Sequence, residues 1–413
     1  MSMKAVTSPP GKPGPRHRRW VLLALGTVVV VGAGLFALRD TQPPVSTAAT
    51  PLCSAGRSPA GSVAVLPVSH WENRYLQTWD FERTEALPAS RSADSWEHYT
   101  LSYAVDANTA VFRATARTRY LDRALEYLNG VVDTARASRS LPTSQYRDDY
   151  RGWVSNRKDL RPTGVEVPLY ESYFWRHATT TLRIMRQTPA VYDDPGYRAQ
   201  YEKLLAFAEV HVFDKWHRRG ANDTIYRSRT HMASHWATIA LNLAAITEDP
   251  ARRDRYRKVV DDIDRKLPNY PTGLRSQLQP HPAEPSAYFW NDEWGSTRRP
   301  GQDVSHANGV MSYVVEAEGQ GDFWTAADMA RFGNLLTKVI WPGERRYAAF
   351  VDGSGSDNGW FSDGLVKLGR YDPAVQQRLE RHDVVNGQFA ANMALNAMIL
   401  QQALSVESSS CPP

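Results

Sequence analysis

Three histidines in two short segments have the residue types and spacing of acid–base chemistry. His231 and His235 lie four residues apart, so a helix would place both on one face. His306 follows Asp303 by three residues, and a carboxylate that close on a helix raises the pKa of an imidazole and fixes its tautomer. Tyr313 is expected near the same helix face. The alternative for each histidine is a buried side chain whose hydrogen bonds are satisfied within the core.

A zinc site at His231 and His235 is the weaker interpretation. The spacing suits two ligands on one helix face, but the acidic residue that stands between the histidines in the common metalloprotease motif is absent. The sequence also lacks the phosphate-binding loops of nucleotide enzymes and the GxSxG elbow of serine hydrolases. We therefore expect no metal and no cofactor.

Several loops combine aromatic rings with amides and carboxylates, which is the composition of a sugar-binding wall. Rings stack on the C–H faces of sugars, while amides and carboxylates hydrogen-bond the hydroxyl groups. One loop supplies Trp290, Asn291 and Asp292, and two others supply Trp153 and Trp360. Any one such loop can merely cap a core, but several in one chain favour a glycan-binding cleft.

Helical periodicity dominates the chain from about residue 70 onward. Apolar residues recur at helical spacing in segments 95–115, 120–135, 169–187, 196–213, 231–247, 251–266, 303–318, 325–340, 361–369 and 388–404. Asp249-Pro250 and Asp372-Pro373 have the form of helix starts, with aspartate as the cap and proline in the first turn. Residues 347–351 are the best candidate for a strand.

Long loops alternate with short connections along the chain. Loops that exceed about 12–15 residues are usually functional, and they occupy residues 139–168, 214–230, 268–302 and 341–360. Helices paired by short turns, with the long loops on one face, predict a mostly α fold, an (α/α) toroid of helical hairpins with a loop-lined cleft. An open helical solenoid is the alternative, because no exact sequence repeat fixes closure.

The N-terminal region predicts a membrane anchor. Residues 1–19 form a basic tail, and residues 20–38 carry no charge. About 20 apolar residues cross a bilayer as a helix. The basic side stays in the cytoplasm, so the rest of the chain lies outside it. The alternative is a cleaved signal peptide, which would secrete the same domain.

Residues 39–69 are rich in proline, serine and glycine and predict a linker, and residues 70–413 then form one helical domain. The two cysteines, Cys53 and Cys411, lie near the two ends of the exported part. A disulfide persists outside the cytoplasm, so we expect these cysteines to be bonded.

The charge balance gives no basis for nucleic-acid binding. Of 49 basic residues, five lie in residues 1–38, and the other 44 match the 44 acidic residues of the chain. Nucleic-acid-binding domains usually present a basic surface. The expected partners are a polysaccharide substrate and, through the N-terminal helix, the membrane; we expect a monomer.

Two motifs resemble those of bacterial exported (α/α)-toroid proteins related to polysaccharide lyases of the alginate type. One is Asp303-Val-Ser-His-Ala-Asn308, followed by Tyr313 and by the Phe-Trp-Thr-Ala-Ala-Asp-Met-Ala-Arg-Phe run at 323–332. The other, Ser234-His-Trp-Ala237, is similar to the Asn-His-Ser-Tyr-Trp segment of alginate lyases, with His235 where that group has tyrosine.

The resemblance implies β-elimination on a uronic-acid glycan. That reaction needs a neutralised carboxylate, a base for the C5 proton and an acid for the leaving oxygen. The resemblance implies that the base is one of His231, His235 and His306. The other roles that it implies are Tyr226 or Tyr288 as the acid, and Asn308, Asn291 or Arg229 as the carboxylate ligand.

Two other functions stay open. A glycoside hydrolase would use two carboxylates, about 5–5.5 Å apart for retention or about 6.5–9.5 Å for inversion. The candidates for this pair are Asp292 or Glu293 with Asp303 or Asp149. A non-catalytic cell-envelope protein would hold glycan on exposed rings without a convergent acid–base set.

Overall fold

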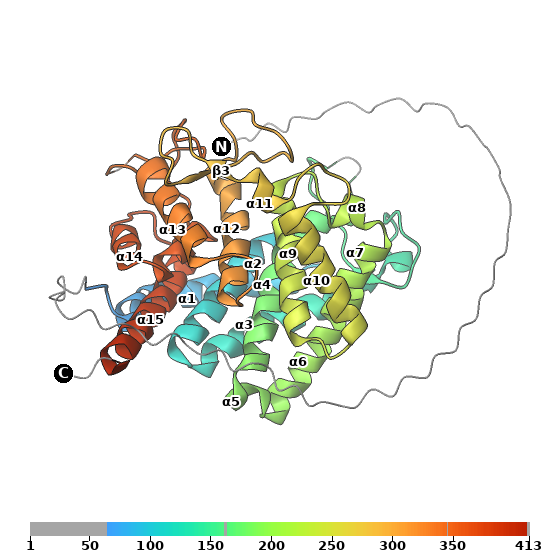
Figure 1. The fold of residues 1–413 in the computed structure, drawn as a ribbon. Helices are drawn as coiled ribbons and strands as arrows, with labels where there is room; N and C mark the ends of the chain where they lie inside the picture. The colour runs from blue at the N-terminus through green and yellow to red at the C-terminus, as the bar shows by residue number, and fades with distance from the viewer. Residues whose placement is uncertain (1–63, 161–162, 345, 411–413) are drawn as a thin grey trace, which may run out of the picture. The chain divides into compact units, whose positions relative to one another are not determined.

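The computed structural model describes residues 64–160, 163–344 and 346–410, and this part of the chain is mostly helical (Figure 1). The expected anchor at residues 20–38, Cys53 and Cys411 lie outside the described residues, so the anchor and the disulfide stay predictions. Within the described part of the chain, no helix combines the length and the apolar character that a membrane span needs.

The helices follow the predicted segments closely. The α-helices are α1 (Val68–Ser90), α2 (Ser95–Thr115), α3 (Thr118–Thr134), α4 (Pro168–Gln187), α5 (Pro189–Tyr192), α6 (Pro195–Phe207), α7 (Lys215–Arg218), α8 (Ala221–Thr224), α9 (Thr230–Ile246), α10 (Pro250–Arg265), α11 (Leu274–Gln277), α12 (Val304–Gly319), α13 (Ala326–Asn334), α14 (Pro373–Glu380) and α15 (Gly387–Ser410). The 3₁₀ segments are η1 (Ser138–Ser140) and η4 (Leu365–Arg370), and the π-helical segments are η2 (Ala208–Asp214) and η3 (Leu335–Ile340).

The strands of the described chain are two-residue pairs in long loops. Strand β1 (Arg136–Ala137) pairs antiparallel with β2 (Arg151–Gly152), and β3 (Gln279–Pro280) pairs antiparallel with β4 (Tyr288–Phe289). The predicted strand at 347–351 is wrong, because these residues form isolated bridges within a loop and no ladder.

Aspartate caps define several helix starts. The carboxylates of Asp249 and Asp372 accept hydrogen bonds from backbone N–H groups in the first turns of α10 and α14, as the sequence predicts. Asp303 caps α12 in the same way. Each cap satisfies amides that have no partner inside the helix, which contributes about 0.5–2 kcal/mol.

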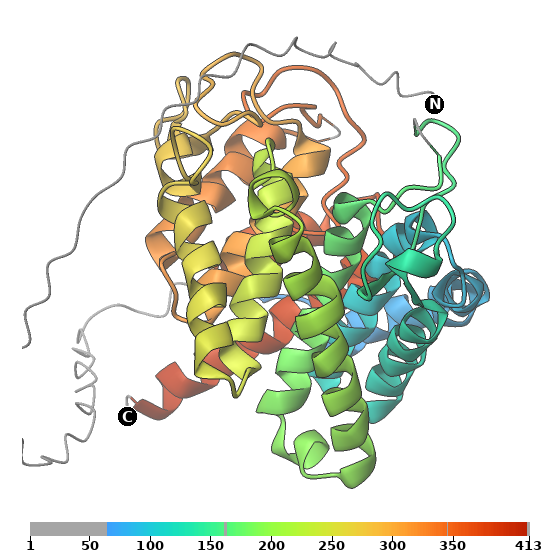
Figure 2. The same ribbon diagram turned by 90° about the vertical axis from the view of Figure 1, so that its right-hand side faces the viewer.

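Six elements contact one another in a closed cycle. Helix α2 packs on α4, α4 on α9, α9 on α12, α12 on η4, η4 on α15, and α15 on α2. A second set of helices packs on these inner elements: α1 on α2 and α15, α3 on α2, α6 on α4, α10 on α9, and α13 and α14 on η4. Figure 2 shows one such pair, the yellow-green α9 and the yellow α10, side by side.

Four inner helices run in the same direction. Tyr99 near the start of α2 stacks on Tyr173 near the start of α4, and Tyr173 contacts His235 of α9. His231 in the first turn of α9 stacks on His306 in the first turn of α12. The long loops that precede α4, α9 and α12 therefore meet at one end of the cycle, where α2 also begins, and we call it the loop end.

Candidate active site

Two imidazoles face each other at the loop end. The rings of His231 and His306 are stacked with their centroids 4.3 Å apart. His231 Nδ1 lies 2.9 Å from Asp292 Oδ1, and His306 Nδ1 lies 2.8 Å from Asp303 Oδ2. Each carboxylate fixes the orientation of its histidine, which leaves Nε2 of each ring as the nitrogen that can exchange a proton.

The two imidazoles differ in exposure. The side chain of His231 is 6% exposed, whereas that of His306 is 48% exposed. Burial lowers the pKa of His231, and the hydrogen bond to Asp292 offsets only part of this effect. The His231 imidazole is therefore held neutral, as a base requires.

The environment of His306 acts in the other direction. Burial lowers its pKa, but the hydrogen bond and the charge of Asp303 outweigh burial and raise the pKa above its ordinary value. Burial raises the pKa of Asp303, but its contacts with His306 have a larger, opposite effect. The net pKa of Asp303 is lowered, so the carboxyl stays ionised. Two neighbouring groups whose pKa values are shifted in opposite directions are typical of an acid and a base, and His306 and His231 are the candidates for these roles.

Arg229 lies beside the buried member of the pair. Its Nη1 lies 2.9 Å from Asp292 Oδ2 and 3.0 Å from Glu293 Oε1. Thr230 N donates to the Asp292 carbonyl at 2.9 Å, which fixes the loop on the first turn of α9. A partly exposed guanidinium next to a base is a suitable ligand for a substrate carboxylate.

Gln302 joins the starts of the two helices that carry the histidines. Its Nε2 donates to Asp303 Oδ2 at 3.2 Å, and its Oε1 accepts from Thr230 Oγ1 at 2.8 Å. Because Thr230 begins α9 and Asp303 caps α12, this buried amide sets the spacing of the histidine pair. The sequence analysis missed Gln302, since a single amide in a long loop gives no periodic signal.

A row of rings continues from the histidine pair toward α2. The ring of His235 lies 6.0 Å from that of His231 and 5.0 Å from that of Tyr173. Tyr99 stacks on Tyr173 at 3.7 Å, and Trp96 stacks on Tyr99 at 4.9 Å. We call Trp96, Tyr99, Tyr173 and His235 the aromatic row. Trp96 and Tyr99 are partly exposed, but their faces are covered by neighbouring side chains, so only their edges can contact a sugar.

His235 lies behind the pair and out of contact with solvent. Burial lowers its pKa well below the ordinary value, and the charge of Arg176 adds to this effect. A Cβ on Gly309 of α12 would lie 2.9 Å from His235 Nε2, so only glycine lets α12 approach the ring this closely. A neutral, buried His235 supports the site through packing.

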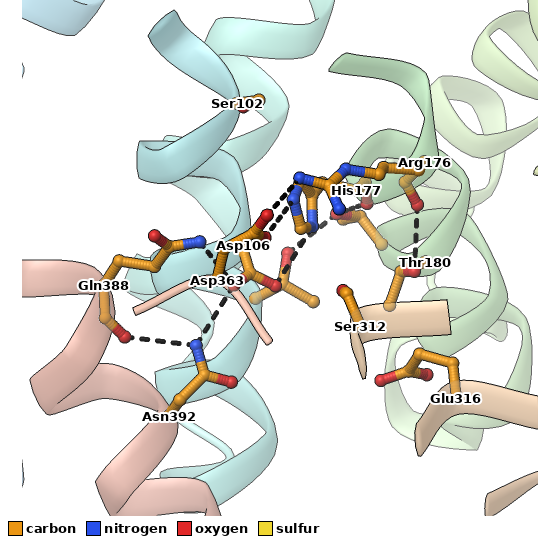
Figure 3. A network of polar contacts seen from close by, with 12 residues as sticks. Ser102, Asp106, Arg176, His177, Thr180, Ser312, Glu316, Asp363, Gln388 and Asn392 are labelled. Atoms are coloured by element: carbon orange, nitrogen blue, oxygen red, sulfur yellow. Dashed lines mark hydrogen bonds and ion pairs between the residues drawn. The ribbon is translucent and has the colours of Figure 1, made fainter. Parts of the chain in front are cut away.

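A buried charged network adjoins the aromatic row (Figure 3). His177 Nδ1 lies 3.1 Å from Asp106 Oδ1, and its Nε2 lies 3.2 Å from Asp363 Oδ1. Arg176 Nη2 lies 2.5 Å from Asp363 Oδ2, and Lys367 Nζ lies 3.2 Å from Asp106 Oδ1. Each carboxylate thus has its own cation. We call these five residues the buried network.

The buried network has ligand atoms for a metal ion but a charge that disfavours one. Potential ligand atoms of Asp106, His177 and Asp363 lie within 4.8 Å of one another. Arg176 and Lys367 already contact the two carboxylates, so a divalent cation would be repelled by them. The sequence analysis did not single out these residues, because they lie far apart in the chain and inside regular helical patterns.

The structure brings some predicted site residues together and separates others. The predicted residues at the loop end are Arg229, His231, His235, Asp292, Asp303 and His306. The tyrosines assigned as acids lie elsewhere: Tyr288 Oη donates to Asp328 of α13, and Tyr226 Oη donates to Asp262 of α10, both at 2.6 Å. Both rings are buried among the outer helices, so neither forms part of this site.

Three further predicted side chains pack in the core. Tyr313 Oη donates to Asp264 at 2.7 Å, and the seven residues from His306 to Tyr313 correspond to about 10 Å along the helix axis. Tyr313 therefore lies about two turns from His306 along α12 and is not part of the loop end. Trp153 and Trp290 are fully buried. Loop composition alone cannot distinguish an aromatic ring that lines a cleft from one that caps a core.

The two predicted asparagines shape loops. Asn308 Nδ2 donates to the Trp360 carbonyl at 2.8 Å, and its Oδ1 accepts from Gly364 N at 3.0 Å. It thereby positions Trp360, whose side chain is partly exposed. Asn291 Nδ2 donates to the carbonyl of Arg298 at 2.6 Å, which holds the loop that carries the partner of His231.

Trp360 borders a hollow of about 400 Å³ between α1, α2 and α15. Tyr103 and Gln388 line the same hollow, and the rings of Trp360 and Tyr103 lie 6.1 Å apart. Tyr103 Oη lies 3.1 Å from Tyr173 Oη. The hollow is therefore connected through Tyr103 to the aromatic row.

Comparisons with known proteins identify no family for this chain. No protein-family model matches it, and no curated protein or solved structure does so either. The resemblance to alginate-type lyases stays a prediction from the motifs around His235 and His306.

Proposed function

We propose that the protein cleaves a uronic-acid polysaccharide by β-elimination. The observation that carries this proposal is the stacked pair of His231 and His306, whose surroundings move their pKa values in opposite directions. Elimination needs one group that accepts a proton and another that donates one, both near neutral pH. A neutral buried imidazole and a protonated exposed imidazole meet these two needs.

The proposed elimination moves one proton to His231 and one proton from His306. Nε2 of His231 accepts the C5 proton, the electrons of that C–H bond form the C4–C5 double bond, and the C4–O bond breaks. His306 gives its Nε2 proton to the leaving oxygen. Arg229 binds the uronate carboxylate, which makes the C5 proton more acidic. Asp292 and Asp303 orient the two rings through their Nδ1 atoms.

The packing cycle of the inner elements supports an (α/α) toroid. In this arrangement α2, α4, α9, α12, η4 and α15 form the inner layer, and α1, α3, α6, α10, α13 and α14 form the outer layer. The substrate cleft then lies at the loop end, where inner helices begin. Because the predicted anchor at residues 20–38 would export this domain, we propose an enzyme outside the cytoplasm, either bound to the membrane or secreted.

The ring surfaces next to the histidine pair suit a polymeric substrate. Trp96 and Tyr99 present partly exposed ring edges at the far end of the aromatic row, and Trp360 lies at the edge of the hollow beside α15. Successive sugars of a chain can contact these rings while one uronate lies at the histidine pair.

The two alternative functions, a glycoside hydrolase and a non-catalytic glycan-binding protein, have less support. Asp303 has a pKa well below its ordinary value after the opposing effects of burial and His306, which disfavours it as the general acid of a hydrolase. Asp292 already contacts both His231 and Arg229. A purely glycan-binding protein has no need for a convergent acid–base pair.

The test is an elimination assay with the full-length protein on a panel of polyuronates and neutral polysaccharides. Elimination produces an unsaturated uronate that absorbs in the ultraviolet. We expect this absorbance with a polyuronate, its loss in His231→Ala and His306→Ala, and its retention in the control His70→Ala, whose side chain is exposed on α1. New reducing ends without absorbance, or binding without turnover, would reject elimination in favour of hydrolysis or of a binding protein.

A further inference from the structure

A charged cavity lies at the end of the inner helices opposite the loop end. It has a volume of about 240 Å³ and is lined by Arg113, Arg183, Arg370 and Glu316. Arg113 belongs to the last turn of α2, and Glu316 is in the last turn of α12. Ten residues, or about 15 Å of helix, separate Glu316 from His306. This cavity, which we call the arginine cavity, is therefore distinct from the loop end.

Three guanidinium groups share one carboxylate in the arginine cavity. Arg183 Nη2 lies 2.5 Å from Glu316 Oε2, Arg113 Nη1 lies 3.5 Å from Glu316 Oε1, and Arg370 Nη1 lies 4.0 Å from the same oxygen. Glu318 also lines the cavity, but its carboxylate accepts from a tyrosine hydroxyl at 2.7 Å. The lining therefore carries more positive than negative charge.

Arg370 has unused hydrogen-bonding capacity although it is only 9% exposed. Its Nε donates to Asn396 Oδ1 at 3.2 Å, but Nη2 has no hydrogen-bond partner among the described residues. Buried polar groups nearly always have a partner. Arg113 is also weakly satisfied, since its polar contact among the described residues is the 3.5 Å ion pair with Glu316.

The pKa shifts agree with an excess of positive charge. Burial lowers the pKa of Arg370, and the charge of Arg113 lowers it further. Burial raises the pKa of Glu316, but Arg113 and Arg183 outweigh burial and bring it to about 2. The carbonyl ends of the helices supply partial negative charge here, yet they leave the Nη2 donor of Arg370 without a partner.

We propose that the arginine cavity binds a small tetrahedral oxyanion, phosphate or sulfate, which contacts Arg113 and Arg370 and stabilises the ends of α2, α12 and η4. Guanidinium groups recognise such oxygens with paired, charge-assisted hydrogen bonds. The volume of about 240 Å³ is several times the roughly 30 Å³ that one water molecule occupies, so a polyatomic ion fits. This inference does not depend on the proposed enzymatic function.

The test measures binding of inorganic phosphate to the full-length protein by calorimetry and by the shift of the melting temperature. The matched variants are Arg113→Met, which removes one cation of the cavity, and Arg91→Met, an exposed arginine elsewhere. We expect a saturable rise of the melting temperature in the unmodified protein and in Arg91→Met, and at least tenfold weaker binding in Arg113→Met. Sulfate should compete with phosphate, and chloride at equal ionic strength should not.

Several outcomes would overturn the proposal. Phosphate and sulfate stabilise proteins generally by exclusion from the surface, so an equal rise in Arg113→Met rejects a specific site. Binding that survives in Arg113→Met but is lost in Arg229→Met would place the ion at the loop end instead. If Arg113→Met does not fold, calorimetry on the unmodified protein still tests the site. The absence of a saturable heat of binding in that experiment would reject it. Glucose 6-phosphate, used in place of inorganic phosphate, shows whether the cavity accepts a phosphate ester as well as the free ion. Binding of either one supports an oxyanion site in the arginine cavity.

Discussion

The loop end and the buried network use the same chemical groups in different surroundings. In both, an imidazole contacts a carboxylate at about hydrogen-bond distance: His231 with Asp292, and His177 with Asp363. In the buried network, each carboxylate also has an ammonium or guanidinium partner and lies out of reach of solvent. At the loop end, His306 is half exposed and Nε2 of each stacked ring is turned away from its carboxylate.

Charge balance and exposure, rather than residue type, separate a reactive cluster from a structural one. A fully paired buried cluster holds its protons and resists change, because removal of any member leaves a charge without compensation. A pair with one half-exposed member and pKa values shifted in opposite directions can take up and release protons. Substitutions in the two regions should therefore have opposite consequences for activity and for stability.

The largest expected effect on activity is that of His231→Ala. Loss of a general base lowers the rate by about 10²- to 10⁴-fold. The free energy of unfolding should fall by less than in a variant of the buried network, since the lost ring is buried but neutral. Initial rates on a polyuronate and urea unfolding followed by circular dichroism measure the two quantities. A variant that keeps its activity would remove His231 from the mechanism.

Asp363→Asn should show the reverse pattern. It leaves Arg176 buried without its counter-charge, and breaking a buried pair in this way costs about 3–5 kcal/mol. We expect a large loss in the free energy of unfolding, measured by urea denaturation, and residual activity in the fraction that stays folded. If the variant is as stable as the unmodified protein but inactive, the buried network belongs to the catalytic site.

Gly309→Ala probes the boundary between the two regions. The added Cβ would lie 2.9 Å from His235 Nε2 and 3.4 Å from His231 Cβ, so α9 and α12 must move apart. Overpacking of this kind costs about 1–3 kcal/mol, and the displaced His231 should also lower the rate. Gly319→Ala is the matched control on the same helix, because no atom lies within 4 Å of the Cβ it would add.

Asp303→Asn tests whether His306 is the general acid. Activity requires neutral His231, whose pKa is lowered, and protonated His306, whose pKa is raised, so kcat/KM should rise and then fall with increasing pH. Without the Asp303 charge the pKa of His306 falls, and the alkaline limb should move to lower pH. The acidic limb should move less. An alkaline limb that does not move would assign it to another group.

The sequence predicted the regular part of the fold well. The periodicity of segment 95–115 matches α2 residue for residue, and aspartate caps located the starts of α10 and α14. Helix α1 (Val68–Ser90) was not predicted, because its apolar residues are spread around the helix and form no clear stripe at helical spacing. The strand proposed at 347–351 failed since a short apolar run in a loop has no distinctive period.

The candidate site was predictable where residues are close in sequence and unpredictable where the fold joins distant ones. The contact of His306 with Asp303 follows from helical spacing, but the stacking of His306 on His231 joins two helices far apart in the chain. The same limit hid the roles of Tyr99 and Tyr173, which look like ordinary core positions until α2 and α4 pack together. Local patterns carry no information about such pairings.

The smallest expected effect is that of Trp360→Ala, which tests whether the sugar chain extends from the histidine pair toward the hollow. Stacking of one ring contributes about 0.5–1.5 kcal/mol, so KM should rise about 2- to 10-fold with kcat unchanged. Trp96→Ala should act similarly from the other side of the aromatic row, since both rings are partly exposed. The effect should grow with the length of the oligosaccharide, because only a long chain reaches both rings. A fall in kcat at unchanged KM would instead make Trp360 a positioning residue for the loop that carries Asp363.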